Sequence, residues 1–174
     1  MGDISVDTRV FHFPDGWRVM KYDDIPYYQN HLKNKKGWKR GMKAVDLVAY
    51  NPGDKMLYLI ESKDYREHQR EKRTPPAKEF FDKVMDTLTG LIPPALCSAT
   101  NTAGESDLQA GIKGAQKLRL IYQFEQPTKH SKLHPRVFDP ADIQLKLRSE
   151  LRCFDPHTLV IEAATQSKVA WTVS

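Results

Sequence analysis

The pattern of apolar and polar positions near the N-terminus predicts a β-hairpin followed by a helix. Residues 8–13 and 17–22 are apolar-rich runs, and the Pro-Asp-Gly segment between them is typical of a turn. A helix is predicted from about Asp24 to the region of Gly37, where glycine and a run of polar residues end the pattern. The chain therefore begins with two strands and one helix.

A second pair of apolar runs predicts the clearest hairpin of the chain. Residues 43–50 and 55–63 are rich in Val, Leu, Ile and Tyr, and an Asn-Pro-Gly-Asp segment joins them. Asn, Pro, Gly and Asp each favour tight turns for a stereochemical reason of their own. We therefore expect two antiparallel strands, in which Tyr50 pairs with Lys55.

Helical periodicity is strongest after Thr74. This N-cap residue is followed by proline, and apolar side chains then recur at helical spacing until Pro93, which predicts a long amphipathic helix. The apolar positions of this helix are Phe80, Phe81, Val84, Met85, Leu88, Leu91 and Ile92. The later elements are predicted as a helix at 107–116, a strand at 118–124, a helix at 139–154 begun by Asp139, and a strand at 158–164.

The order of these elements predicts a single mixed α/β domain over residues 1–174. It comprises an N-terminal hairpin within 1–23, a core over about 24–124, and a C-terminal helix and strand extension over 139–174. Hydrophobic residues make up 40% of the chain, which excludes wholesale disorder. No apolar run approaches the roughly 20 residues that cross a bilayer. With only two cysteines, the chain is expected in the reducing cytoplasm, without membrane attachment.

Basic residues outnumber acidic ones by 27 to 22, and the net charge of +5 favours polyanionic partners. Residues 33–43 are especially basic, contain an aromatic side chain and hold no acid. This composition suits phosphate contacts beside a stacking surface, although a solvated loop has the same composition. The predicted nucleic-acid contacts are Lys35, Lys36, Trp38, Lys39, Arg40, Lys43, Arg66 and Arg70.

Two acidic residues interrupt the apolar strands of the second hairpin. Asp46 and Glu61 both follow apolar residues, at positions where burying an unpaired charge is costly. In the predicted register the two carboxylates are diagonal neighbours, and Lys63 shares their face of the sheet. Close carboxylates supply the hard oxygen ligands that suit Mg²⁺ or Mn²⁺, and a lysine beside them can act on water or phosphate. The alternative is a structural ion pair between Lys63 and the acids.

The spacing of Asp46, fourteen intervening residues and then Glu61-Ser62-Lys63 on the second strand of a hairpin resembles the PD-(D/E)xK nuclease superfamily. A long helix and a further strand follow in the order that this family uses, so the resemblance covers about residues 24–124. It implies a restriction-endonuclease-like fold, in which helices flank a central mixed β-sheet. It also implies that Asp46, Glu61 and the Ser62 carbonyl hold the metal, while Lys63 assists catalysis.

The chain departs from the family pattern in two ways. Family members often take a further acid, commonly Glu, from the first helix, but this chain has no Glu before Glu61. That leaves Asp23 or Asp24, of which Asp24 is the named candidate. The family also has a strand between the first helix and the strand with the aspartate. Because residues 37–42 leave little room for it, the N-terminal hairpin or a very short strand would have to substitute.

These features predict a hydrolase, namely a Mg²⁺- or Mn²⁺-dependent nuclease that cleaves phosphodiester bonds with a metal-activated water, in DNA rather than RNA. Little chain remains outside the core for sequence recognition, so a homodimer or a separate targeting protein would supply it. The alternative is a catalytically inactive nuclease-fold module. Such a module would bind nucleic acid or a protein partner, for example in a defence or toxin and immunity system.

Overall fold

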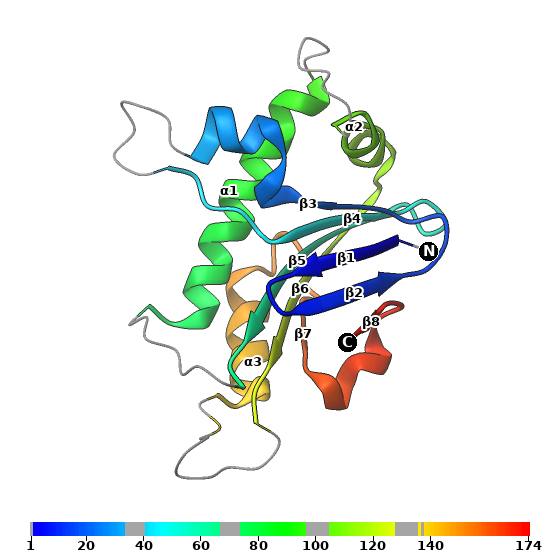
Figure 1. The fold of residues 1–174 in the computed structure, drawn as a ribbon. Helices are drawn as coiled ribbons and strands as arrows, with labels where there is room; N and C mark the ends of the chain where they lie inside the picture. The colour runs from blue at the N-terminus through cyan, green and yellow to red at the C-terminus, as the bar shows by residue number, and fades with distance from the viewer. Residues whose placement is uncertain (1, 34–40, 67–73, 97–104, 128–135, 137) are drawn as a thin grey trace.

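The computed structural model describes residues 2–33, 41–66, 74–96, 105–127, 136 and 138–174. Within these ranges the chain forms a five-stranded mixed sheet, β3-β4-β5-β6-β7, and a three-stranded antiparallel sheet, β1-β2-β8 (Figure 1). The strands are β1 (Gly2–Val6), β2 (Arg9–Phe13), β3 (Arg18–Lys21), β4 (Leu47–Asn51), β5 (Met56–Asp64), β6 (Lys117–Glu125), β7 (Leu159–Ile161) and β8 (Thr172–Val173). The helices are α1 (Pro76–Leu96), α2 (Glu105–Gly114) and α3 (Pro140–Glu150), with the 3₁₀ helices η1 (Tyr22–Asp24) and η4 (Ala163–Lys168) and the π-helix η2 (Tyr28–Lys33). The predicted mixed α/β class is confirmed.

Strands β4 and β5 form the predicted antiparallel hairpin, but their register differs from the predicted one. Tyr50 pairs with Leu57 and not with Lys55, because the loop comprises residues 52–55 and Lys55 itself adopts a positive φ of 51°. The Asn51 side chain stabilises this loop, since its Oδ1 accepts the N–H of Gly53 at 3.0 Å. Because the pairing partner shifts by two residues, every side chain keeps the face of the sheet that was predicted for it.

The pairing of the predicted N-terminal hairpin is wrong. β2 pairs with β1 and β8, whereas β3 pairs with β4 in the large sheet. The hairpin at this end of the chain joins β1 to β2 through Asp7 and Thr8, and Asp7 adopts the positive φ of 52° that so short a turn requires. β3 thereby becomes an edge strand beside β4, but in the chain it precedes η1 and η2, whereas the resemblance implies a strand after the first helix.

The parallel half of the large sheet follows the predicted order of elements. β5, β6 and β7 run parallel, with α1 and α2 between β5 and β6 in the chain and α3 before β7. Asp139 caps α3 as predicted, because its carboxylate accepts the N–H of Ala141 at 2.8 Å. The helix ends at Glu150, earlier than residue 154, and β7 is followed by η4 and β8, which were not predicted.

The helix predicted from Asp24 is replaced by η1 and η2, and its end near Gly37 lies outside the described residues. Helix α1 starts at Pro76, two residues after the predicted N-cap Thr74, and continues through Pro93 and Pro94 to Leu96. Both prolines lie in the last turn, so their missing N–H groups remove two i→i−4 hydrogen bonds close to the end of the helix, where only two further residues follow. None of the described helices is long and apolar enough to cross a membrane.

The two faces of the large sheet are covered by different layers. Alternate strand residues such as Val48, Leu59 and Leu120 pack with Phe80 and Leu147 from the helices. The residues between them pack against the small sheet, and this second cluster consists of Val6, Phe11, Phe13, Leu47, Ala49, Ile60, Ile121, Ile161 and Trp171. Because side chains alternate along a strand, odd-numbered residues of β5 face the helices and even-numbered ones face the small sheet.

Helix α1 buries a narrower apolar stripe than predicted. Phe80, Val84 and Leu91 are buried, but Ile92 is 55% exposed. The polar residue Thr87 is fully buried on the same stripe, where its Oγ1 accepts the N–H of Val45 at 3.0 Å. This contact attaches the helix to the chain directly before β4 and so places α1 against the acidic residues of the hairpin.

Candidate active site

The structure brings the two predicted acids together on the helix face of the large sheet. Leu47 of β4 pairs with Ile60 of β5. Asp46 is the residue before Leu47, and Glu61 is the residue after Ile60. The exposed fractions are 9% for Asp46 and 1% for Glu61. The backbone of β5 holds the Asp46 carboxylate in place, because Asp46 Oδ2 accepts the N–H of Ser62 at 2.7 Å. This hydrogen bond therefore fixes the position of the Asp46 side chain.

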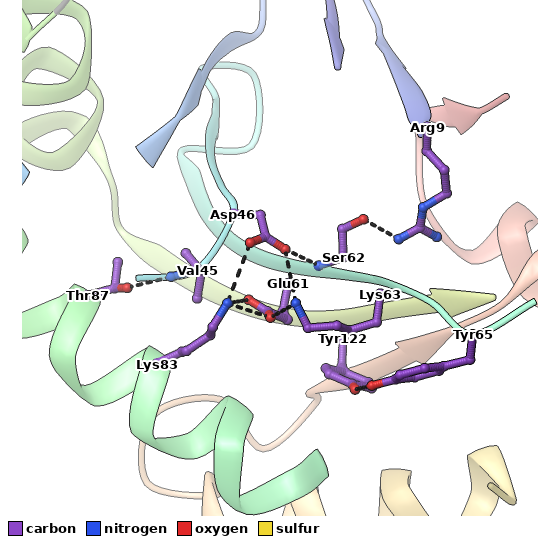
Figure 2. A network of polar contacts seen from close by, with 10 residues as sticks. All are labelled: Arg9, Val45, Asp46, Glu61, Ser62, Lys63, Tyr65, Lys83, Thr87 and Tyr122. Atoms are coloured by element: carbon purple, nitrogen blue, oxygen red, sulfur yellow. Dashed lines mark hydrogen bonds and ion pairs between the residues drawn. The ribbon is translucent and has the colours of Figure 1, made fainter. Parts of the chain in front are cut away.

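Two ammonium groups meet these carboxylates (Figure 2). Lys63, two residues after Glu61 on the same strand, has its Nζ 2.6 Å from Glu61 Oε1 and 4.0 Å from Asp46 Oδ2. Lys83 reaches in from α1, and its Nζ lies 2.6 and 2.8 Å from the two oxygens of Glu61 and 3.5 Å from Asp46 Oδ1. The site is thus a compact cluster of two acids and two lysines.

Sequence reasoning missed Lys83, although a signal was present. Lys83 stands three residues after Phe80 and four before Thr87, so it falls within the buried stripe of α1. A lysine in an apolar stripe is unusual unless its ammonium has a partner, and the partner is the acid pair. Which partner it has depends on the packing of α1 against β5, and helical periodicity carries no information about that packing.

The electrostatics of the cluster favour a cation beside Glu61. Burial raises the pKa of Glu61, and the ammonium groups of Lys83 and Lys63 act against that effect. Burial lowers the pKa of Lys63, but the charges of Glu61 and Asp46 outweigh it and leave the pKa raised. A buried carboxylate is stable only with such compensation. Positive charge at this point is therefore part of what holds the site together.

The donor set fits a small divalent cation. Both oxygens of Glu61 and one of Asp46 converge on a single point, which the Nζ of Lys83 occupies at distances of 2.6 to 3.5 Å. Hard carboxylate oxygens are the ligands that Mg²⁺ and Mn²⁺ prefer, and Mg²⁺ needs only one or two from the protein. The part of the chain that the structure describes has no cluster of three or more His, Cys, Asp or Glu that could hold a metal ion. Water and substrate would have to complete the shell.

The structure distinguishes between the two residues that could add a third acid. Asp24 is exposed and forms an ion pair with Lys21 at 3.0 Å. Asp23 is half-buried, and burial raises its pKa, with smaller contributions from the charges of Asp24 and Asp46. Its buried Oδ1 has no hydrogen-bond partner among the described residues. Asp23 thus has an electrostatic interaction with Asp46, whereas Asp24 pairs with Lys21, and a role for either residue as a third metal ligand stays a prediction.

Most of the predicted nucleic-acid contacts cannot be placed. Lys35, Lys36, Trp38, Lys39, Arg40 and Arg70 lie outside the described residues. Lys43 lies beside α1, where its Nζ is 3.0 Å from a carboxylate oxygen of Asp82. Arg66 pairs with Asp64 just after β5 at 2.6 Å and, mainly through its side-chain hydrogen bond, lowers the pKa of that acid to about 2. Both described cations thus have acidic partners, and contact with phosphate stays a prediction for them.

The middle residue of the triplet faces the other layer. The side chain of Ser62 points towards the small sheet, where its hydroxyl accepts a hydrogen bond from the guanidinium of Arg9 on β2 (Figure 2). Arg9 is only 3% exposed, and burial lowers its pKa. This contact ties the small sheet to the strand that carries Glu61 and Lys63. The predicted role of the Ser62 carbonyl stays a prediction.

Comparisons of the chain with protein-family models, with curated proteins and with solved structures give no significant match.

Proposed function

We propose that the chain is a metal-dependent nuclease of the restriction-endonuclease-like class, which hydrolyses phosphodiester bonds in DNA in preference to RNA. One observation carries the proposal: two buried carboxylates converge on a single point that already holds a cation, with Lys63 beside them. A purely structural ion pair needs one acid and one base, whereas three carboxylate oxygens focused on one point are typical of a cation site. The basic composition of the chain supports a polyanionic substrate.

Each residue of the cluster has a role in this proposal. Asp46 and Glu61 hold Mg²⁺ or Mn²⁺, which supplies Lewis-acid stabilisation of the phosphate and lowers the pKa of water. The N–H of Ser62 fixes one oxygen of Asp46, so that this carboxylate does not have to reorganise. The side chain of Lys63 is 24% exposed, so its ammonium can contact both Glu61 and a phosphate or water from solvent. Asp23 is the acid that would strengthen the site from the N-terminal side.

The same geometry supports a second candidate, the catalytically inactive nuclease-fold module. Lys63 and Lys83 together balance the charges of Asp46 and Glu61, so the cluster is neutral without any metal. A module that only binds nucleic acid or a protein would need no metal ion at this cluster. The two candidates differ in one measurable property, because only the nuclease binds divalent metal at Asp46 and Glu61.

The test is cleavage of labelled plasmid, single-stranded DNA and RNA in Mg²⁺, Mn²⁺ or EDTA. The variants are Asp46→Asn and Lys63→Met, which keep the size of each side chain. We expect metal-dependent cleavage by the wild type and a loss of at least about 100-fold in both variants. The matched control is Lys78→Met, on the exposed face of α1, which should cleave like the wild type.

The binding-module candidate makes the opposite prediction. If the purified wild type cleaves none of these substrates and calorimetry detects no Mn²⁺ binding, the nuclease proposal is wrong. Cleavage that survives Asp46→Asn would also contradict it, because the activity would then come from another site or from a contaminant. Circular dichroism of each variant checks that a lost activity does not reflect a lost fold.

A further inference from the structure

The two lysines of the cluster bind the carboxylates in different ways. Lys63 contacts one oxygen of Glu61 at 2.6 Å and is 4.0 Å from Asp46. Lys83 contacts both oxygens of Glu61, at 2.6 and 2.8 Å, and lies 3.5 Å from Asp46 Oδ1. Its ammonium is thus at the focus of the three oxygens, where a divalent cation would have to bind, while Lys63 stands to one side.

Side-chain packing and a hydrogen bond fix the backbone of α1 on both sides of Lys83. Its neighbours Phe80 and Val84 are fully buried, and Thr87, one turn further along, accepts the N–H of Val45 at 3.0 Å. The ammonium, by contrast, is at the end of a flexible four-carbon side chain. Lys83 can therefore leave the carboxylates by rotating its own side chain, without any movement of α1.

We propose that Lys83 is an internal counter-ion that occupies the place of the divalent cation, so that metal binding must displace its ammonium from Glu61 and Asp46. This inference rests on the proposed function, because it assumes that these acids bind metal. An ammonium and a metal ion cannot share the same three oxygens, since each needs their lone pairs and the two cations repel each other. The displaced ammonium stays within the reach of its side chain and can bind a phosphate of the substrate.

Two consequences follow from this competition. Metal affinity in the absence of substrate is lower than two buried carboxylates would give alone, because the Lys83 ion pair must be broken first. A phosphodiester that binds the displaced ammonium increases metal affinity, and by linkage the metal increases the affinity for the phosphodiester. Because of Lys83, metal binding at the site thus depends on bound substrate, while the metal-free site remains electrically neutral.

The experiment measures Mn²⁺ binding by calorimetry to the full chain and its variants, with Mn²⁺ alone as the probe. Lys83→Met should bind Mn²⁺ at least about tenfold more tightly than the wild type, because no ammonium then occupies the point on which the three oxygens converge, although Lys63 still contacts Glu61. Lys83→Arg keeps the charge and should match the wild type. Lys78→Met removes an exposed lysine from the same helix and should also leave the affinity unchanged. Asp46→Asn combined with Lys83→Met should abolish binding.

The outcomes separate this inference from the proposed function. If the wild type binds Mn²⁺ and Lys83→Met binds it equally or more weakly, the inference is wrong while the metal site stands. If neither protein binds Mn²⁺, the metal-dependent function is lost and the inference with it. Binding that is detected only in Lys83→Met supports the inference, because the lysine then blocks the site in the absence of substrate, and the cleavage assay of the wild type alone decides the proposed function.

A second measurement uses the wild type and so does not depend on the folding of a variant. Mass spectrometry can follow how fast an amine-acylating reagent modifies each lysine. In the metal-free protein the Lys83 side chain is 15% exposed and is engaged by Glu61, so it should react slowly. Mn²⁺ should increase its acylation rate several-fold and leave the rate of Lys78 unchanged. If calorimetry shows that the wild type is saturated with Mn²⁺ and the rate at Lys83 is unchanged or lower, the inference is overturned.

Discussion

On one face of β5 the ammonium of Lys83 meets two carboxylates, and on the other face the guanidinium of Arg9 meets a hydroxyl. Both cations lie against the same triplet, because Glu61 and Lys63 face the helices while Ser62 faces the small sheet. Arg9 is 3% exposed, and the Lys83 side chain is 15% exposed. Both cations are therefore largely buried, Arg9 more deeply than Lys83, and the two faces compensate their charges differently.

The difference shows what each cation does for the fold. Lys83 neutralises acids that are themselves buried, so it belongs to a charge cluster in which each member needs the others. Arg9 has no ion pair with a carboxylate among the described residues, and its Nη1 is buried without a hydrogen-bond partner there. Its guanidinium also lies 5.7 Å from the ring centre of Phe11. Removing charge on the helix face should therefore cost much more than removing it on the small-sheet face.

The largest expected effect is on the helix face. Glu61→Gln leaves Lys63 and Lys83 facing each other, with Asp46 as their common partner at 4.0 and 3.5 Å. Because breaking a buried ion pair leaves uncompensated charge, we expect the free energy of unfolding to fall by about 3 to 5 kcal/mol. Urea denaturation at neutral pH measures this. The control Glu150→Gln, on the exposed side of α3, should change it by less than about 0.5 kcal/mol.

A much smaller effect is expected on the small-sheet face. Arg9→Met removes the donor to Ser62, but it also removes a desolvated charge and fills the space with an apolar side chain. The two effects oppose each other, so the free energy of unfolding should change by about 1 kcal/mol or less. The same urea denaturation measures the free energy of unfolding of Arg9→Met, for comparison with that of Glu61→Gln. If Arg9→Met proves as costly as Glu61→Gln, the comparison fails, and the more distant charges of Asp64 and Glu125 must compensate Arg9.

The smallest effect concerns an ion pair on the same helix as Lys83 but near the surface. A hydrogen bond from Lys78, with a smaller contribution from Lys43, lowers the pKa of Asp82 below its ordinary value of 3.8. A carboxyl group with a lowered pKa in the folded state stabilises the fold above its ordinary pKa, and this stabilisation is lost as the pH falls through the lowered value.

The test compares the free energy of unfolding of the wild type with that of Asp82→Asn across pH. The difference should be at most about 1 kcal/mol at pH 6, because exposed pairs are weak. It should shrink as the pH falls below 3.8 and also as NaCl is added. A difference that grows in acid would contradict the assignment. A small value here beside a large one for Glu61→Gln would show that burial, and not the number of ion pairs, sets the energetics of the helix face.

Several features of this chain were predictable because their causes lie within a few residues. The turn after Asn51 and the cap at Asp139 depend on local side-chain chemistry, and both are present. Helix α1 begins within two residues of the predicted position. The placement of Glu61 and Lys63 on one face follows from the two-residue period of a strand. That period also explains why the wrong register still placed Asp46 on their face, since a shift of two residues preserves it.

The interactions that complete the candidate site join distant parts of the chain. Lys83 and Glu61 are 22 residues apart, and Arg9 and Ser62 are 53 apart. Periodicity can place a lysine on a buried stripe, but it cannot name the strand against which that stripe packs. For the same reason the local pattern identified β2 and β3 as strands yet assigned them the wrong partners. Local sequence was enough to indicate an acidic, lysine-bearing strand pair, whereas the layers packed on each face decided which cations meet those acids.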